Sequence, residues 1–468
     1  MTGKTKGSGN ATGSSAAETI RAAALHRRQL LRAALAGSAA MAVGFRVSPV
    51  RGQAKKFAGV TISGSGFQST HHEYIKAFLP EFEAETGMKV DFQLQAFPVF
   101  NQRMDLELST KGSAYDFANL TFIYSGRWVN AGWFTPLDEF AKDRNKTPDD
   151  WDANDFVSGT IQHLKNAKGE TFAFPWEAGG MLMAASRGDL IEKAGLKMPT
   201  TFDELMKVCE AVNGKDGVSA FVADRLHHWN WIPYLMGFGG KVFRDPPGDL
   251  MPAFDTPEAA KAAEYYARLI TEMSPPGVMS FSDDQAMRAQ ISGRSNIRTQ
   301  AITWLTPLVA HKESKVATTA RFSVMPVGPN GNFPGSNSHG LGIPAGAKNK
   351  DAAWAFISWA LSKKMIGRLV QEKGYGAVCR RSVITSDYFT KAMTMNGDSV
   401  APLFLQVLEL GGKTGYMKYR TVPVFPQVGD KINKAIERIA TKQQTAAAAL
   451  AQAKEEAIGD LKKAGINL

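Results

Sequence analysis

Polar and apolar positions alternate in two ways along the chain after residue 56. Short apolar runs have the length and composition of strands. Between them, apolar residues recur three or four positions apart, as on one face of a helix. The pattern predicts strands at 57–64, 88–97 and 116–120, alternating with helices at 70–87 and 99–112. Strand–helix–strand order predicts a parallel sheet with right-handed crossovers, and therefore an α/β fold.

Helix start signals continue this pattern in the second half of the chain. Thr201 to Glu204 and Ser282 to Gln285 are capping boxes, and Pro257 after Thr256 is typical of a first helical position. Further elements are predicted as strands at 218–224 and 295–302 and helices at 349–364 and 445–465. The chain has 468 residues, of which 44% are hydrophobic, so two α/β units are expected.

The first 54 residues have a different composition. Arg27 and Arg28 precede a moderately apolar stretch, and Gly52-Gln53-Ala54 is a small-residue cleavage site. This order predicts an N-terminal extension with an export signal at 1–54, and the paired arginines indicate the twin-arginine route. The alternative is a short membrane anchor or an amphipathic basic helix. Against the anchor, the apolar run is short for a bilayer span and Arg32 interrupts it.

Charge and cysteine content narrow the possible partners. The formal net charge is +11, but residues 1–54 hold eight of the basic residues and one acidic residue, so the remainder carries only +4. That excess is too small and too dispersed to predict nucleic acid as a partner. Cys209 and Cys379 are the only cysteines, and export would permit a disulfide between them. We expect instead two unpaired buried thiols.

Aromatic and small polar residues gather where the predicted strands end, the edge at which ligands bind in open α/β sheets. The sequence HHWNW at 227–231 is the densest example. Rings there could stack on the apolar face of a sugar, while polar groups satisfy its hydroxyls. The alternative is that each tryptophan fills the core. The candidate stacking residues are Tyr124, Trp176, Trp229, Trp231 and Trp304, and the candidate polar contacts are Gln68, His71, Glu177, Asp224 and Asn230.

Five segments in order resemble one protein family, the maltose-binding type of extracellular solute-binding protein (family 1) that serves ATP-binding-cassette importers. Together they span most of residues 55–468. The segments are AFLPEFEAETGMKV, PWEAGGMLMAASRGDLIEKAGLKMPTTFDELMKV, MRAQISGRSNIRTQAITW, SNSHGLGIPAGAKNKDAAWAFISWALS and AALAQAKEEAIGDLKKAG.

The resemblance implies a two-lobed periplasmic-binding-protein fold (type II) whose lobes close on a ligand. About three hinge crossings would lie near 175, 300 and 360. The implied lobes are 55–174 with 300–360, and 175–299 with 361–468. The implied function is a monomeric, non-enzymatic periplasmic protein that binds a carbohydrate or polyol and delivers it to membrane permease subunits, without a cofactor. Neither the solute nor the choice between transport and sensing follows from the resemblance.

Other motifs in the sequence could indicate metal binding, anion binding or catalysis. His72-Glu73 begins a zinc-protease pattern that Lys76 breaks, and His227-His228 has no carboxylate or Cys support for a metal. No metal site or catalytic residue is therefore expected. Arg380-Arg381 could hold an anion, although solvent exposure is favoured. The alternative function is an exported carbohydrate-active enzyme, which would need a carboxylate pair across the cleft. Glu177 and Asp224 are the only obvious candidates.

Overall fold

The computed structural model describes residues 56–301, 305–310 and 312–468, and its centre is a mixed β-sheet. The main strands lie in the order β2-β1-β3-β10-β4-β8-β5, and β9 pairs with β4. Their bounds are β1 (Thr61–Phe67), β2 (Lys89–Gln95), β3 (Phe117–Leu120), β4 (Ala173–Ala185), β5 (Ser219–Phe221), β8 (Ser295–Ala301), β9 (Arg321–Val324) and β10 (Ser336–Gly342). Two small ribbons are β6 (Phe243–Asp245) with β7 (Asp249–Pro252) and β11 (Thr394–Met395) with β12 (Asp398–Ser399).

The α/β class is confirmed, but the purely parallel sheet is not. β1 pairs in parallel with β2 and β3, and β5 pairs in parallel with β8. However, β10 is antiparallel to both β3 and β4, and β4 is antiparallel to β8 and β9. Local periodicity cannot show strand direction when the partner lies more than a hundred residues away, as β10 does from β4.

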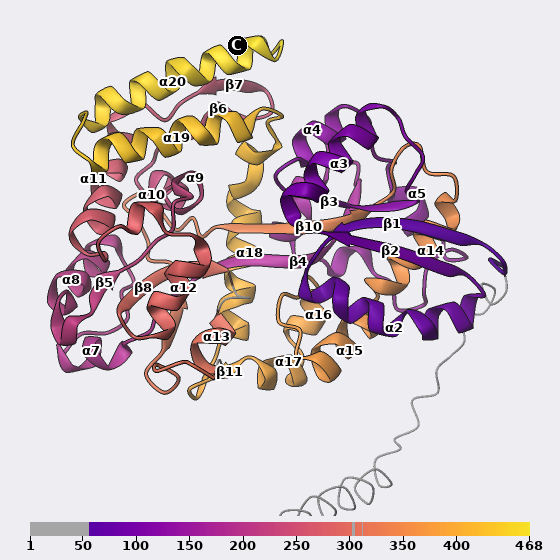
Figure 1. Cartoon of the computed structure of the whole chain (residues 1–468), viewed down its shortest axis with the longest axis horizontal. Helices are drawn as coiled ribbons and strands as arrows, with labels where there is room; N and C mark the ends of the chain where they lie inside the picture. Colours follow the sequence, from indigo (N-terminus) through magenta and orange to yellow (C-terminus); the bar gives the residue numbers. More distant parts are fainter. Residues whose placement is uncertain (1–55, 302–304, 311) are drawn as a thin grey trace, which may run out of the picture. The chain divides into compact units, whose positions relative to one another are not determined.

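The 13-residue strand β4 links two hydrophobic cores (Figure 1). Its first part, up to Gly180, pairs with β10, and its last five residues pair with β8 and β9. All but one of its residues are buried. Because both faces are covered, the strand is an almost unbroken apolar run instead of an alternating one. The expected crossing near 175 therefore falls within β4.

The buried apolar residues form two separate clusters. The first contains most of the core between 57 and 182 and between 341 and 408, and the second most of that between 183 and 297 and between 416 and 461. We expected 361–468 in the second lobe, yet the core residues from Leu361 to Leu408 belong to the first cluster. We propose that each cluster is the core of one lobe, with the last crossing between Leu408 and Tyr416 instead of near 360.

Most helices pack against one of the two cores. Those of the first core are α2 (Thr70–Thr86), α3 (Phe97–Ser109), α4 (Ser125–Asn130), α5 (Asp138–Lys142), α6 (Ser158–Ile161), α13 (Leu305–Ala310), α14 (Lys350–Ala360), α15 (Lys363–Lys373), α16 (Arg381–Ile384), α17 (Asp387–Ala392) and α18 (Ala401–Thr414). Those of the second are α7 (Gly188–Lys193), α8 (Phe202–Val212), α9 (His227–Asn230), α10 (Ile232–Gly237), α11 (Pro257–Glu272), α19 (Phe425–Ala440) and α20 (Ala446–Lys463). The helix α12 (Asp283–Ile291) contributes to both.

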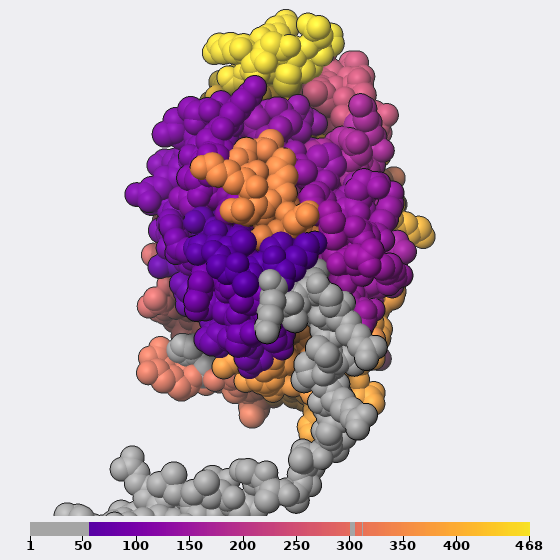
Figure 2. Space-filling view, turned by 90° about the vertical axis from the view of Figure 1, so that its right-hand side faces the viewer, coloured from indigo at the N-terminus to yellow at the C-terminus, as the bar shows by residue number. Residues whose placement is uncertain are grey.

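Both predicted capping boxes are present, with Thr201 opening α8 and Ser282 opening α12. The predicted helix at 349–364 is instead two helices, because Ser362 caps a new one, α15. Figure 2 shows orange residues of the α14–α15 region enclosed by indigo and purple residues from the N-terminal third, in agreement with the contacts of α15 with α2 and of α14 with β3.

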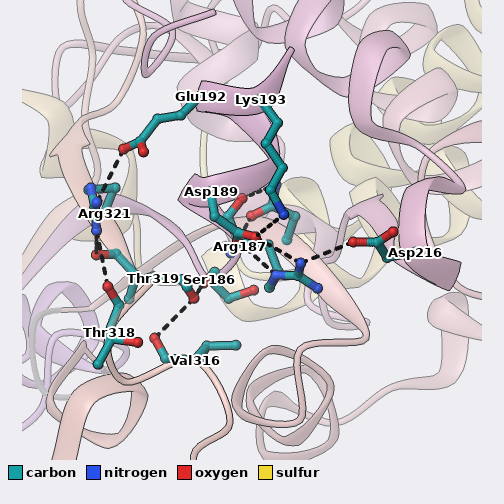
Figure 3. Close-up of polar contacts among 12 residues, drawn as sticks. Ser186, Arg187, Asp189, Glu192, Lys193, Asp216, Val316, Thr318, Thr319 and Arg321 are labelled. Carbon is teal, nitrogen blue, oxygen red and sulfur yellow. Dashed lines mark hydrogen bonds and ion pairs between the residues drawn. The ribbon is translucent and has the colours of Figure 1, made fainter. Parts of the chain in front are cut away.

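Ion pairs fix the chain where β4 ends in the second lobe (Figure 3). The Arg187 guanidinium donates to both carboxylate oxygens of Asp189, at 2.8 and 2.9 Å, and reaches Asp216 at 3.3 Å. Arg321 on β9 pairs with Glu192 at 3.1 Å. The Arg187 guanidinium lowers the pKa of Asp189 to about 2. The turn after β4 is thus clamped by local charge pairs.

Three sequence-based expectations about single residues have clear outcomes. Cys209 and Cys379 are both free and buried, which confirms unpaired thiols. Arg380 was expected to face solvent but is fully buried against Trp151 and Phe156, where Asp155 pairs with it at 3.2 Å. Only its neighbour Arg381 is exposed. A basic pair in sequence carries no information about which of the two arginines is buried.

Two expectations fall outside the described residues: the export segment 1–54 and Trp304. Within the described part of the chain, no helix combines the length and apolarity needed to cross a membrane.

Candidate functional site

The candidate site begins where β1 ends and α2 starts. Ser69 is the N-cap of α2, and its side chain accepts a hydrogen bond from the backbone N–H of His72. The His72 ring contacts Ser69 through Nδ1 and lies 3.1 Å from Asn119 Oδ1 through Nε2. Both nitrogens of His72 are therefore engaged. This pairing fixes the first turn of α2 and with it the position of the preceding residue, His71.

Trp176 on β4 lies at the centre of the site. Its ring stacks on His71 with centroids 4.8 Å apart and on His339 at 5.8 Å. Phe67, at the end of β1, approaches Trp176 at 5.6 Å and His339 at 4.8 Å. Residues from β1, α2, β4 and β10 thus form one aromatic surface at the strand ends.

The second lobe adds a ring to this surface. Phe122, just after β3, lies 4.9 Å from His339 and 5.9 Å from Trp229 on α9. We call Phe67, His71, Phe122, Trp176, Trp229 and His339 the cleft rings. Phe122 follows β3 but packs, like Trp229, against the second core. Its contact with His339 on β10 therefore brings the central sheet next to α9.

A close backbone approach beside the cleft rings also joins the lobes. Gly126 in α4 lies so near the Thr421 carbonyl that a Cβ at position 126 would clash with it. Thr421 ends the 3₁₀ helix η7 (Tyr416–Thr421), whose buried tyrosines belong to the second core. Because the clashing atom is a backbone carbonyl, a side chain at position 126 would require the backbone to move, so a glycine is needed here.

Several buried polar atoms at the cleft rings have no hydrogen-bond partner among the described residues. Both ring nitrogens of His71 are in this state, as are Nδ1 of His339 and Nε1 of Trp176. Leaving such a group unsatisfied in a dry site costs about 1–3 kcal/mol each. Burial also lowers the pKa of His71 and of His339 to about 3, so both rings are neutral and can donate one hydrogen bond and accept another. Such a surface is complementary to a solute with several hydroxyl groups.

Glu177 adds a carboxyl group next to Trp176. It lies opposite His339 in the β4–β10 ladder and is half-buried. Burial raises its pKa to about 7. Near neutral pH it is therefore partly protonated and can act as donor or acceptor.

Asp224 and Asn230 hold the second-lobe side of the site in place. The buried Asp224 carboxylate accepts from Arg298 at 2.8 Å, from the Leu226 backbone N–H at 2.8 Å and from Asn230 Nδ2 at 3.0 Å. These bonds fix α9, which carries Trp229. The internal partners of Asp224 indicate a positioning role for it.

The ten predicted site residues therefore divide into groups. His71 and Trp176 lie together, and Glu177 lies opposite His339 in the β4–β10 ladder. Trp229 is linked to His339 through Phe122. Tyr124 stacks instead on Trp128, and Gln68 is exposed beside the site. Trp231 is fully buried in the second core, because α9 turns it away from Trp229. Trp304 lies outside the described residues, so its predicted role stays a prediction.

Sequence reasoning missed four residues at or beside the cleft: Phe67, Phe122, His339 and Arg420. The first two follow predicted strands and could have been chosen on the same grounds as Tyr124. His339 lies on an antiparallel strand that has no alternating pattern. Arg420 lies in η7, where the sequence gives no signal of a site. His227 and His228, weighed as metal ligands, contact Tyr266 and Asn433.

The sequence is similar to those of known solute-binding proteins. The chain is 26% identical to a mannitol-binding protein of Pseudomonas aeruginosa over 78% of its length and 85% of that protein. It is 22% identical to an erythritol/L-threitol-binding protein of Mycolicibacterium smegmatis, over 80% and 85%.

Solved structures show the same two-lobed fold. A solute-binding protein of Agrobacterium vitis with bound D-mannitol superposes with a TM-score of 0.70 at 24% identity, covering 86% of this chain and 99% of that one. A family model described as bacterial extracellular solute-binding protein matches residues 68–366, well over half of the chain. The protein therefore belongs to the family of bacterial extracellular solute-binding proteins.

Proposed function

We propose that the protein captures a polyol or a related carbohydrate between its lobes and delivers it to the membrane permease of an ATP-binding-cassette importer. The observation that carries this proposal is the set of stacked rings with unpartnered polar atoms around Trp176. Rings cover the C–H face of such a solute, and neutral imidazoles pair with its hydroxyls. The polyols named for the Pseudomonas and Mycolicibacterium relatives have this chemistry.

Closure gives the proposed binding its energetic basis. A ligand shifts the lobes toward the closed state only by the contacts that it makes there and not in the open state. His71 and Trp176 come from the first lobe and Trp229 from the second, so a solute among them contacts both sides only when the lobes are closed. The closed form is the one expected to engage the permease. We propose that the protein acts there as a monomer.

The test is a binding screen on protein that has been unfolded and refolded to remove carried solute. Polyols of four to six carbons, monosaccharides and disaccharides are compared by thermal shift and then by calorimetry. A ligand at a hundred times its Kd stabilises by about 2.7 kcal/mol. We expect stabilisation by one class of polyhydroxylated solute. If no solute raises the melting temperature, a polyol or carbohydrate ligand is wrong.

The same preparation tests the enzymatic alternative. A glycoside hydrolase needs two carboxyl groups flanking the bond, and Asp224 is committed to Arg298, Leu226 and Asn230. We propose that the protein has no such activity. Product formed from any bound glycan would contradict this.

We propose further that the twin-arginine route exports the protein to the periplasm, on the evidence of Arg27-Arg28 and the apolar stretch that follows. Replacing both arginines by lysine should retain the precursor in the cytoplasm. Unchanged export, or export in a host without the twin-arginine translocase, would exclude this route.

A further inference from the structure

Arg420 is a buried cation beside the cleft rings that has no acidic partner among the residues that the structure describes. Its side chain is 3% exposed, and its Nε has no hydrogen-bond acceptor in the described part of the chain. No ion pair involves it among the described residues. Removing a guanidinium from water without an anion or acceptors is strongly unfavourable. We therefore expect Arg420 to contact an acceptor or anion that comes from a bound solute.

Four aromatic rings that belong to or pack against the second core surround this guanidinium. Its Cζ lies 4.3 Å from the ring centroid of Phe425 and 5.3 Å from that of Tyr419, both in the second lobe. It also lies 5.3 Å from Trp229 and 5.7 Å from Phe122, which are cleft rings. Cation–π contacts recover part of the desolvation cost, about 2 kcal/mol or more for a dry contact, but they leave the buried Nε–H without an acceptor. Arg420 is thus held rigidly at the point where the lobes meet.

The charges nearest to the site leave this cation uncompensated. The second-lobe carboxylate Asp224 is neutralised by Arg298. His228, which faces Arg420, has its pKa lowered to about 3 by burial and by that guanidinium. Glu177, with its pKa raised to about 7 by burial, loses part of its negative charge near neutral pH. The net charge around the cleft rings is therefore zero or positive. A site for a neutral polyol would not need the positive charge of Arg420.

We propose that the solute is an acidic polyol, a chain of hydroxylated carbons with one anionic group, and that this group pairs with Arg420. This inference rests on the proposed function and narrows its ligand class. The planar guanidinium binds a carboxylate through two parallel hydrogen bonds. The anionic group would lie against the Arg420 guanidinium, beside Phe122 and Trp229. The hydroxylated chain would extend along Trp176, His71 and His339. A single cation matches the single charge of a carboxylate better than the two charges of a phosphate.

The test compares solutes that differ at one carbon. Calorimetry measures D-mannitol, D-mannonate and D-mannitol 1-phosphate against the full-length protein after refolding without solute. We expect mannonate to bind at least about tenfold more tightly than mannitol, since hydrogen bonds to charged groups are among the strongest in proteins. That preference should weaken as salt concentration rises. Tighter binding of the phosphate would support the anionic group but assign it to a phosphorylated polyol.

Three variants locate the effect. Arg420→Gln should reduce the preference for mannonate to less than about threefold, while Arg420→Lys should retain part of it, because lysine keeps the charge but not the planar fork. Arg381→Gln is the matched control, since it removes the same charge from an exposed residue that pairs with Glu409. It should leave both affinities unchanged. If Arg420→Gln preserves the preference, or Arg381→Gln abolishes it, the assignment to Arg420 is wrong.

The outcomes separate this inference from the proposed function. If mannitol binds as tightly as mannonate or more tightly, the acidic ligand is excluded and polyol binding stands. If neither the neutral nor the acidic compounds bind, and the wider panel of sugars also fails, the proposed function itself is overturned. Thermal unfolding of each variant without ligand shows that loss of affinity is not loss of fold.

Discussion

Two buried arginines of the second lobe show how differently this protein uses the same side chain. Arg298 is 2% exposed and pairs with Asp224 at 2.8 Å and with Asp283. Arg420 is 3% exposed and is surrounded by rings without an acid. Arg298 has its counter-charges within the chain, so it belongs to the scaffold that positions α9. Arg420 has none there, so its partner is expected from outside. A buried cation without a carboxylate partner therefore points to the proposed ligand more directly than a paired one.

The largest expected effect on stability comes from replacing Arg298, the arginine that is paired with carboxylates. Arg298→Gln leaves the Asp224 carboxylate buried without a cation, which should cost about 3–5 kcal/mol of unfolding free energy. Arg420→Gln leaves no buried charge behind and should change it by no more than about 1 kcal/mol. Urea unfolding of the unliganded proteins measures both. Similar losses for the two variants would mean that Arg420 is also a scaffold residue.

The next effect concerns an unpartnered imidazole at the cleft. The folded-state pKa of His71 is lowered by burial from 6.5 to about 3, so below pH 6.5 the unfolded chain binds a proton that the folded chain does not. The contribution to stability is thus greatest above pH 6.5 and falls by about 1.4 kcal/mol per pH unit on acidification. His71→Gln should reduce the loss of stability between pH 7 and pH 5 by about 2 kcal/mol. An unchanged loss would show that His71 titrates normally.

A smaller effect is expected where a cleft ring contacts Arg420. Trp229→Ala should weaken binding of the preferred solute about tenfold, because a half-buried ring that faces the solute is lost, with little change in stability. Trp133→Ala is the matched control, since Trp133 is also half-buried and lies beside an arginine, Arg127, but has no ring contact with the cleft rings in the described part of the chain. Calorimetry should show unchanged affinity for this control. Equal losses in the two variants would remove Trp229 from the proposed site.

The smallest effect on stability is expected from replacing Asp189, a carboxylate near the surface that is paired with Arg187. Asp189 has its pKa lowered from 3.8 to about 2 by Arg187, so its stabilising effect is complete above pH 3.8 and disappears as pH falls through about 2. Asp189→Asn should cost about 1 kcal/mol at pH 7 and nothing below pH 2, with ligand affinity unaffected. Equal unfolding free energies of the two proteins at pH 7 would show that the ion pair contributes nothing.

The sequence by itself determined the class of the fold and predicted the sheet edge at which we propose that the solute binds. Apolar periodicity and caps such as Thr201 and Ser282 depend on neighbours within a few residues, so they can be read without a structure. Trp229 was found because it follows a predicted strand, and side chains that follow strands meet at one edge of the sheet. Trp176 was chosen on the same grounds, although it lies within β4.

Only the tertiary structure decided which residues meet. The antiparallel placement of β10 brings His339 to Trp176, although 163 positions separate them in the chain. The same holds for charge: Arg298 has two carboxylates beside it and Arg420 has none. Both outcomes depend on contacts between distant segments, and their energies come from burial, which a linear pattern does not record.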